Sequence, residues 1–154
     1  MTVEIGAAVP DFSAASTAGE FRLSEARGSP VLIYFYPKDN TAGCTAESQD
    51  FAAAHRQFAR HHTVIVGVSR DSIKSHLAFK QKLYLPFELL SDPDEKLCVL
   101  FDVIKNKTMY GRPVRGIERS TFLLDAGGVL RNEWRGVKVP GHVEQTLQAV
   151  RSLG

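Results

Sequence analysis

The stretch "VLIYFYPKDNTAGCTAE", residues 31–47, joins an apolar run, a polar loop and the start of a helical pattern. The run "VLIYFY" (31–36) is aliphatic and aromatic throughout, which is typical of a strand buried on both faces. From Ala42 to His61 the apolar residues recur at helical spacing, with Phe51, Ala54 and Phe58 on one stripe. The stretch therefore predicts a buried strand that leads through a short loop into a helix.

The next part of the chain continues this alternation. Residues 63–69 ("TVIVGVS") and 87–92 ("FELLSD") predict two further strands. Residues 71–83 between them predict a helix with Asp71 as its cap. Another helix is expected in "DPDEKLCVLFDV" (92–103), where Asp92 can cap, Pro93 stands at the first helical position and Glu95 follows the cap by three.

The end of the chain predicts a hairpin and a helix. Residues 119–125 and 129–134 flank Ala126-Gly127-Gly128 as an antiparallel hairpin. Residues 142–153 form an amphipathic closing helix. Residues 10–28 suggest a small N-terminal hairpin and a turn of helix. This order predicts an α/β, thioredoxin-like fold with a mixed central sheet flanked by helices. The N-terminal hairpin and the 103–118 connection are additions to it, and residues 1–154 form one domain.

Composition narrows the classes of function. Hydrophobic residues make up 44% and charged residues 23% of the chain, as in an ordinary globular protein. A net charge of +2 with scattered basic residues argues against nucleic acid. No apolar run is long enough for a membrane span, and the first residues carry Glu4 with no basic region, so a reducing cytoplasm is expected. We expect neither a metal nor a cofactor, because the two cysteines lie far apart and no ligand set surrounds them.

Cys44 has surroundings that a packing residue does not require. It follows a strand and lies in the first turn of the next helix, where unpaired backbone N–H groups and the helix dipole favour a thiolate. Thr41 precedes it by three residues, so a hydroxyl can reach the sulfur or a substrate oxygen. Pro37 stiffens the entry to the loop. A nucleophilic cysteine is the predicted role.

Pro37, Thr41 and Cys44 form the pattern P-x-x-x-T-x-x-C, which resembles the active-site motif of the peroxiredoxins. The segments "FYPKDNTAGCTAE", "GVSRDS", "LLSDPDEKLC" and "GIERSTFLLD" are similar to the bacterioferritin-comigratory (PrxQ) branch, over nearly the whole chain. The resemblance implies a thiol peroxidase acting on hydrogen peroxide and alkyl hydroperoxides. Cys44 would be the peroxidatic cysteine, and Thr41 would bind the peroxide in a pocket shaped by Pro37. Arg119 would anchor thiolate and peroxide.

The chain departs from many relatives in its second cysteine. A resolving cysteine often stands five residues after the first, where this chain has Gln49, or in the next helix, and residues 71–83 contain none. Cys98 remains, on the apolar stripe of its helix, and is interpreted as a buried structural thiol. We therefore expect a one-cysteine mechanism with an external reductant, either thioredoxin or glutaredoxin with glutathione. A two-cysteine cycle through Cys98 stays open, as does the oligomeric state, for which a monomer or a weak dimer is expected.

Three further hypotheses remain open. Glu47, about one turn beyond Cys44, either orients the arginine or is a solvated helix residue. A thioredoxin-like thiol–disulfide oxidoreductase is the alternative enzyme, disfavoured because Thr41 stands where a C-x-x-C motif would have its first thiol. A non-catalytic protein on the same fold is the alternative outside enzymes. The lone histidines His55, His76 and His142 are interpreted as surface residues.

Overall fold

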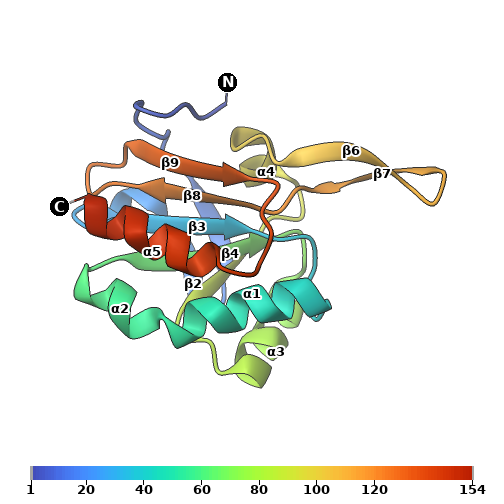
Figure 1. The fold of residues 1–154 in the computed structure, drawn as a ribbon, viewed down its shortest axis with the longest axis horizontal. Helices are drawn as coiled ribbons and strands as arrows, with labels where there is room; N and C mark the ends of the chain where they lie inside the picture. The colour runs from blue at the N-terminus through green and yellow to red at the C-terminus, as the bar shows by residue number, and fades with distance from the viewer. Residues whose placement is uncertain (1, 154) are drawn as a thin grey trace.

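The computed structural model describes residues 2–153, which form a seven-stranded sheet flanked by helices and a separate two-stranded sheet (Figure 1). The strands are β1 (Ser13–Ser16), β2 (Gly19–Arg22), β3 (Val31–Phe35), β4 (Val64–Ser69), β5 (Glu88–Ser91), β6 (Ile104–Met109), β7 (Arg112–Ile117), β8 (Ser120–Leu124) and β9 (Leu130–Arg135). The helices are η1 (Leu23–Ala26), a 3-10 turn, and α1 (Ala42–Ala53), α2 (His55–Arg60), α3 (Ile73–Leu83), α4 (Lys96–Leu100) and α5 (His142–Ser152).

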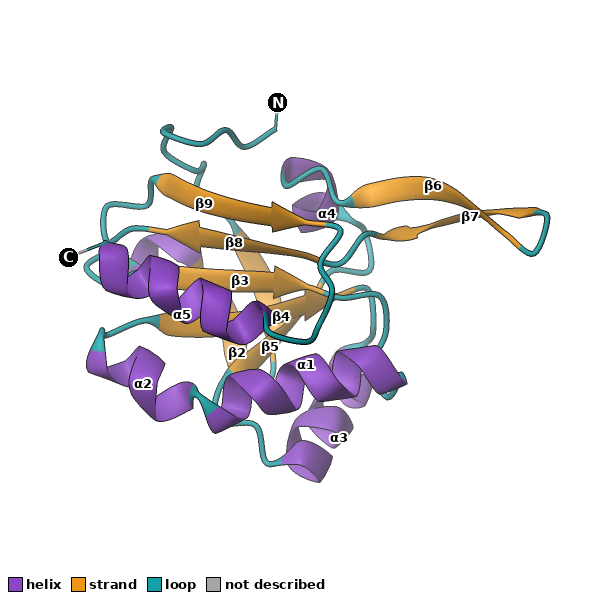
Figure 2. Cartoon of the chain, viewed as in Figure 1, coloured by secondary structure: helices purple, strands orange, loops and turns teal. Residues whose placement is uncertain are grey.

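The main sheet has the order β2-β1-β5-β4-β3-β8-β9 (Figure 2). Strand β3 pairs parallel to β4 and antiparallel to β8, and β4 pairs parallel to β5. The sheet is therefore mixed, as the sequence predicted, with a parallel centre and antiparallel edges. The predicted hairpin at the end of the chain is confirmed as β8 and β9.

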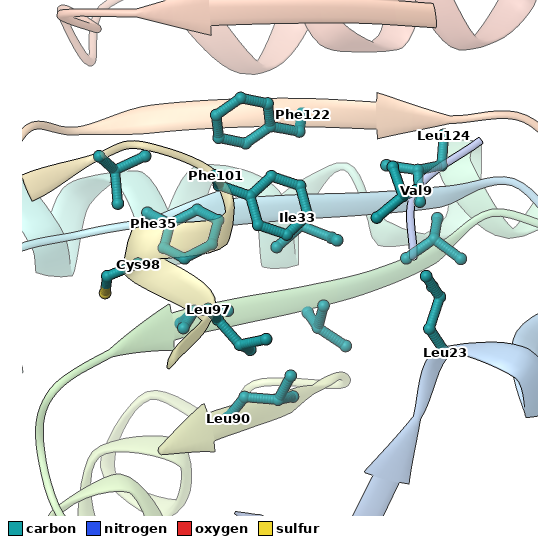
Figure 3. Close-up of a cluster of buried hydrophobic side chains, with 14 of the residues drawn as sticks. Val9, Leu23, Ile33, Phe35, Leu90, Leu97, Cys98, Phe101, Phe122 and Leu124 are labelled. Carbon is teal, nitrogen blue, oxygen red and sulfur yellow. The ribbon is translucent and has the colours of Figure 1, made fainter. Parts of the chain in front are cut away.

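Every residue of β3 is buried, because helices or loops cover both faces of the sheet. Leu32 and Tyr34 join a core cluster with side chains from α1, α2, α3 and α5. Ile33 and Phe35 point to the other face, where α4 and the N-terminal segment pack (Figure 3). An unbroken apolar strand is the pattern that such a two-sided core requires.

Four details of the sequence prediction are wrong. The helix expected from residue 42 to 61 is two helices, α1 and α2, which are separated at Ala54. Only this one residue leaves the helical conformation, so the spacing of the apolar side chains does not reveal the break. Helix α3 is capped by Ser72, whose hydroxyl accepts a hydrogen bond from the Ser75 N–H at 3.1 Å, and not by Asp71. Residues 103–118 are the β6–β7 hairpin rather than a plain connection.

The fourth correction concerns α4, which begins at Lys96 instead of Pro93. Glu95 has φ of 62°, so the chain makes a left-handed step before the helix starts. Asp92 still serves the helix, because its carboxylate accepts hydrogen bonds from the N–H groups of Leu97 and Cys98. None of the helices within residues 2–153 is both long and apolar enough to cross a membrane.

Candidate active site

Cys44 lies in the first turn of α1, directly after the loop that leaves β3. Thr41 is the N-cap with extended φ and ψ, and the helix begins at Ala42, as the sequence predicted. The Cys44 side chain is 0% exposed and belongs to the core cluster that contains Tyr34 and Phe51. The positive end of the helix dipole is thus beside a sulfur that is shielded from bulk water.

Arg119 joins Cys44 to Glu47, which lie one turn apart on α1, although Arg119 itself is distant from both in sequence. Its Nη2 donates a hydrogen bond to Cys44 Sγ at 3.3 Å, and its Nη1 donates to Glu47 Oε1 at 2.7 Å. Arg119 immediately precedes β8, which pairs with the central strand β3. A rigid sheet therefore holds one end of the arginine, and a buried carboxylate fixes the other.

The charges of this group depend on one another. Burial raises the pKa of Glu47 to about 7, although Arg119 opposes the shift. Burial alone would lower the pKa of Arg119, but the neighbouring Glu47 and Cys44 raise it above its usual range. Glu47 is 0% exposed, so the solvated interpretation is wrong and the arginine-orienting one agrees with the contacts.

Gly43 allows the close approach of the arginine to the helix. A Cβ atom at this position would lie 3.1 Å from Arg119 Nη2, which is tighter than ordinary carbon–nitrogen contact. The absence of a side chain between Ala42 and Cys44 therefore leaves space for the guanidinium group.

Thr41 and Pro37 lie at the exposed rim of the same loop. The Thr41 hydroxyl donates a hydrogen bond to the carbonyl of Lys38 at 2.8 Å. The structure thus brings Cys44, Arg119 and Glu47 into direct contact, with Thr41 one helical turn before the sulfur and Pro37 at the loop entry.

Cys98 is far from this group in the fold. It is fully buried in α4 and belongs to the core cluster on the opposite face of the sheet from Cys44 (Figure 3). Burial, together with the nearby Asp92 carboxylate, raises the pKa of the Cys98 thiol well above its ordinary value. Both cysteines are free thiols, and the packing agrees with a structural role for Cys98.

The surface assignment of two histidines is wrong. His76 is 0% exposed and His142 is 2% exposed. His142 Nε2 is 2.8 Å from the Thr121 hydroxyl, and its ring packs edge-on to Phe51 and Trp134. Burial lowers the pKa of His142 to about 4, with the Arg119 charge adding to the shift and a hydrogen bond with Gln145 opposing it.

A buried polar group beneath the loop was missed altogether. Asp39 and His76 interact directly there, under the residues that precede Cys44. A signal for His76 existed in the sequence, because it precedes Phe79 by three residues and Leu83 by seven and so shares their helix face. Asp39 had no such signal, since loop residues follow no periodicity.

A cysteine thiol in the first turn of a helix, hydrogen-bonded by an arginine that the sheet of a thioredoxin-like fold holds in place, is typical of thiol-dependent enzymes. The AhpC/TSA family matches residues 5–133 of the chain. Peroxiredoxin Bcp of Bacillus subtilis is 48% identical over 154 residues, which cover 99% of this chain and 98% of that protein.

Solved structures agree with this assignment. The bacterioferritin comigratory protein of Xanthomonas campestris has a TM-score of 0.90 at 47% identity, covering 97% of this chain and 96% of that one. A cysteine-to-serine variant of Xylella fastidiosa PrxQ has a TM-score of 0.92 at 40% identity, covering 99% and 98%. The chain belongs to the AhpC/TSA family, within its Bcp/PrxQ peroxiredoxins. It is an enzyme, a thiol-dependent peroxidase that uses a peroxide and a thiol reductant, and its thioredoxin-like fold is confirmed.

Proposed function

We propose that Cys44 is the peroxidatic cysteine and that Arg119, Thr41 and Pro37 complete the catalytic site. The observation that carries the proposal is the hydrogen bond from Arg119 Nη2 to Cys44 Sγ, at 3.3 Å. A cation fixed beside the sulfur favours the thiolate, which is the nucleophilic form of cysteine.

The proposed reaction begins with attack of the Cys44 thiolate on the nearer peroxide oxygen. The S–O bond forms as the O–O bond breaks, the sulfur is oxidised to sulfenic acid, and the departing hydroxide or alkoxide takes a proton to become water or alcohol. Negative charge moves from sulfur to the leaving oxygen, so the positive Arg119 side chain stabilises both ends of the transfer.

Thr41 and Pro37 are proposed to bind and shelter the peroxide. The Thr41 hydroxyl donates to Lys38 O, and a hydroxyl that donates one hydrogen bond can still accept another. It would therefore accept the peroxide O–H and help to hold the O–O bond in line with the attacking sulfur. Pro37 limits the conformations of the loop entry and so helps to keep the peroxide in place.

We propose that the sulfenic acid is reduced by an external thiol, in a one-cysteine mechanism. The first thiol displaces water to give a mixed disulfide, and a second thiol releases the Cys44 thiolate. Structures of the Xanthomonas relative include serine variants of two different cysteines. Those two cysteines are 36 residues apart in the relative; 36 residues after Cys44 this chain has Lys80, in α3, and its own second cysteine, Cys98, is on the opposite core face.

The reductant, substrate and assembly follow from these proposals. Thioredoxin or glutaredoxin with glutathione would supply the thiol, in the reducing cytoplasm where such a cycle can turn over. Hydrogen peroxide and alkyl hydroperoxides are the proposed substrates, because the Xanthomonas relative is described for alkyl peroxide reduction. One chain contributes Cys44, Arg119, Thr41 and Glu47, so a monomer or weak dimer would contain the complete site.

The testing experiment replaces Cys44 with serine. Cys44→Ser should abolish peroxide reduction supported by dithiothreitol, since a serine hydroxyl is not ionised near neutral pH. The matched control is Cys98→Ala, which should retain turnover. Circular dichroism checks that both variants are folded. Turnover above trace level in folded Cys44→Ser would disprove the assignment.

A further inference from the structure

A buried polar cluster lies beneath the loop that precedes Cys44. Asp39 and His76 are its centre, with side chains 1% and 0% exposed, and His76 Nδ1 is 2.8 Å from Asp39 Oδ2. The same Asp39 oxygen accepts a hydrogen bond from Ser75 Oγ at 2.8 Å, and Oδ1 accepts one from Tyr36 at 2.6 Å. Strand β3, the loop and helix α3 meet in this cluster.

The partners of His76 determine where its protons are. Its Nε2 is 2.9 Å from the Leu90 carbonyl oxygen, which can only accept a hydrogen bond, so Nε2 carries a proton. Its Nδ1 faces the Asp39 carboxyl group, and a second proton must lie in that contact. The pair therefore holds two protons and is neutral as a whole. Loss of either proton would leave a buried charge or a buried lone pair facing an acceptor.

The pair fastens a loop that contains a left-handed turn. Asn40, the residue after Asp39, has φ of 66°, a conformation that asparagine adopts more readily than most residues with a side chain. The Asp39 N–H is held as well, by Asp71 Oδ2 at 2.9 Å. A loop released from these contacts would relax away from its present path, and Thr41 and the first turn of α1 would move with it.

Cys44 needs that movement in one half of its cycle. A peroxide is small enough to reach a shielded sulfur, whereas a thiol reductant must bring its own sulfur to about 2 Å from Cys44 to form a mixed disulfide. Cys44 is 0% exposed, so the start of α1 has to open before a protein reductant can bind covalently.

We propose that the Asp39–His76 pair is the latch that holds loop 37–41 and the first turn of α1 closed over Cys44. Closed, it positions Thr41 and Cys44 for the peroxide; open, it admits the reductant. His76 is thus a positioning residue that acts through Asp39. The inference rests on the proposed role of Cys44, which it deepens by naming the group that controls access to that sulfur.

The test compares His76→Gln with a matched control, Glu88→Gln. Glutamine cannot donate at both ends as His76 does. Glu88 also fastens α3, through Lys80 at 2.5 Å, but from the strand β5 and not from the loop. Hydrogen–deuterium exchange of the reduced protein should be about 10- to 100-fold faster in peptides covering residues 37–46 of His76→Gln, the factor expected from losing a charge-assisted hydrogen bond. Glu88→Gln should leave those peptides unchanged.

Kinetics provide a second readout that a purely structural role would not produce. In His76→Gln the rate constant for hydrogen peroxide should fall about tenfold, while reduction of the sulfenic acid by thioredoxin should become faster. Unchanged exchange at 37–46, equal acceleration in Glu88→Gln, or a parallel loss of both rates would overturn the latch.

A milder variant keeps the proposal testable if His76→Gln does not fold. Tyr36→Phe removes only the hydroxyl that donates to Asp39, and should accelerate exchange at residues 37–46 by a few-fold. No acceleration in this variant would also overturn the latch. Exchange is measured without peroxide, so failure of the latch and failure of Cys44 as the peroxidatic residue give separate results.

Discussion

Arg119 is the residue through which two distant parts of the sequence act on one sulfur. Its planar guanidinium group serves Cys44 and Glu47 at once, with one nitrogen for each acceptor. A lysine ammonium group is a point charge on a flexible stem and cannot reproduce this fork. The position therefore requires the shape of arginine as well as its charge.

The first prediction at this scale is that Arg119→Lys lowers the second-order rate constant for hydrogen peroxide by about 10²–10³-fold, the cost of removing one preorganised donor. Stopped-flow fluorescence of Trp134 would measure it. Arg115→Lys is the control, because Arg115 is also bound by two nitrogens to a carboxylate, that of Glu95, but on the exposed hairpin. An Arg119→Lys rate equal to that of the control would show that the fork is unimportant.

Glu47 carries a second prediction, on stability. Its pKa is raised by burial to about 7, so between about pH 4.5 and 7 the folded state binds a proton that the unfolded state has released. The contribution of Glu47 to stability therefore falls as pH rises through this window and is constant above it. Glu47→Gln lacks this loss. The difference in free energy of unfolding, Glu47→Gln minus the native chain, should therefore increase by roughly 2 kcal/mol from about pH 5 to about pH 8. Urea titration at each pH would measure it. A pH-independent difference would contradict the raised pKa.

At the scale of elements, α4 places Cys98 on the other side of the central sheet from Cys44. It packs on the face of the sheet opposite α1, and its first turns are held by Asp92. A disulfide needs Cα atoms within about 7 Å, which these two helices reach only if one of them unfolds locally.

We therefore predict that stoichiometric peroxide, without reductant, converts Cys44 to sulfenic acid and then, with excess peroxide, to sulfinic acid. Mass spectrometry of the intact chain and its peptides would follow the products. Cys98→Ala should give the same products at the same rates. A Cys44–Cys98 disulfide that forms faster than sulfinic acid would refute this and establish a two-cysteine cycle.

At the scale of the whole molecule, helix α5 is fastened to the sheet through a buried neutral histidine. His142 lies at the start of α5 and contacts Thr121 of β8 as well as the ring of Phe51 in α1. Its ionisation therefore affects the packing of two helices on one face of the sheet.

This arrangement predicts acid sensitivity with a definite sign. The pKa of His142 is lowered to about 4, so below its ordinary value near 6.5 the unfolded state takes up a proton that the folded state refuses. Stability should fall by about 2 kcal/mol from this group as pH decreases from about 6.5 to 4. His142→Gln should lack that part of the decrease in urea titrations. An identical pH profile in variant and native chain would exclude His142 as the cause.

The sequence alone determined the main elements and singled out the residues that we propose as reactive, because both depend on local patterns. The apolar run 31–36 predicted a strand buried on both faces, and β3 is such a strand. The motif of Pro37, Thr41 and Cys44, together with the matching segments elsewhere in the chain, indicated the family, and the helix start beside the cysteine follows from the same stretch.

Only the tertiary structure decided which distant groups meet. Glu47 and His76 are polar residues whose burial depends on partners far away in sequence, Arg119 for one and Asp39 for the other. Likewise, Asp92 and Cys98 were recognised on one helix, but the left-handed step at Glu95 and the face of the sheet that covers Cys98 result from packing. Periodicity reports which face of an element is apolar. The cost of burying a charge is offset only by a specific partner, and the complete fold alone supplies that partner.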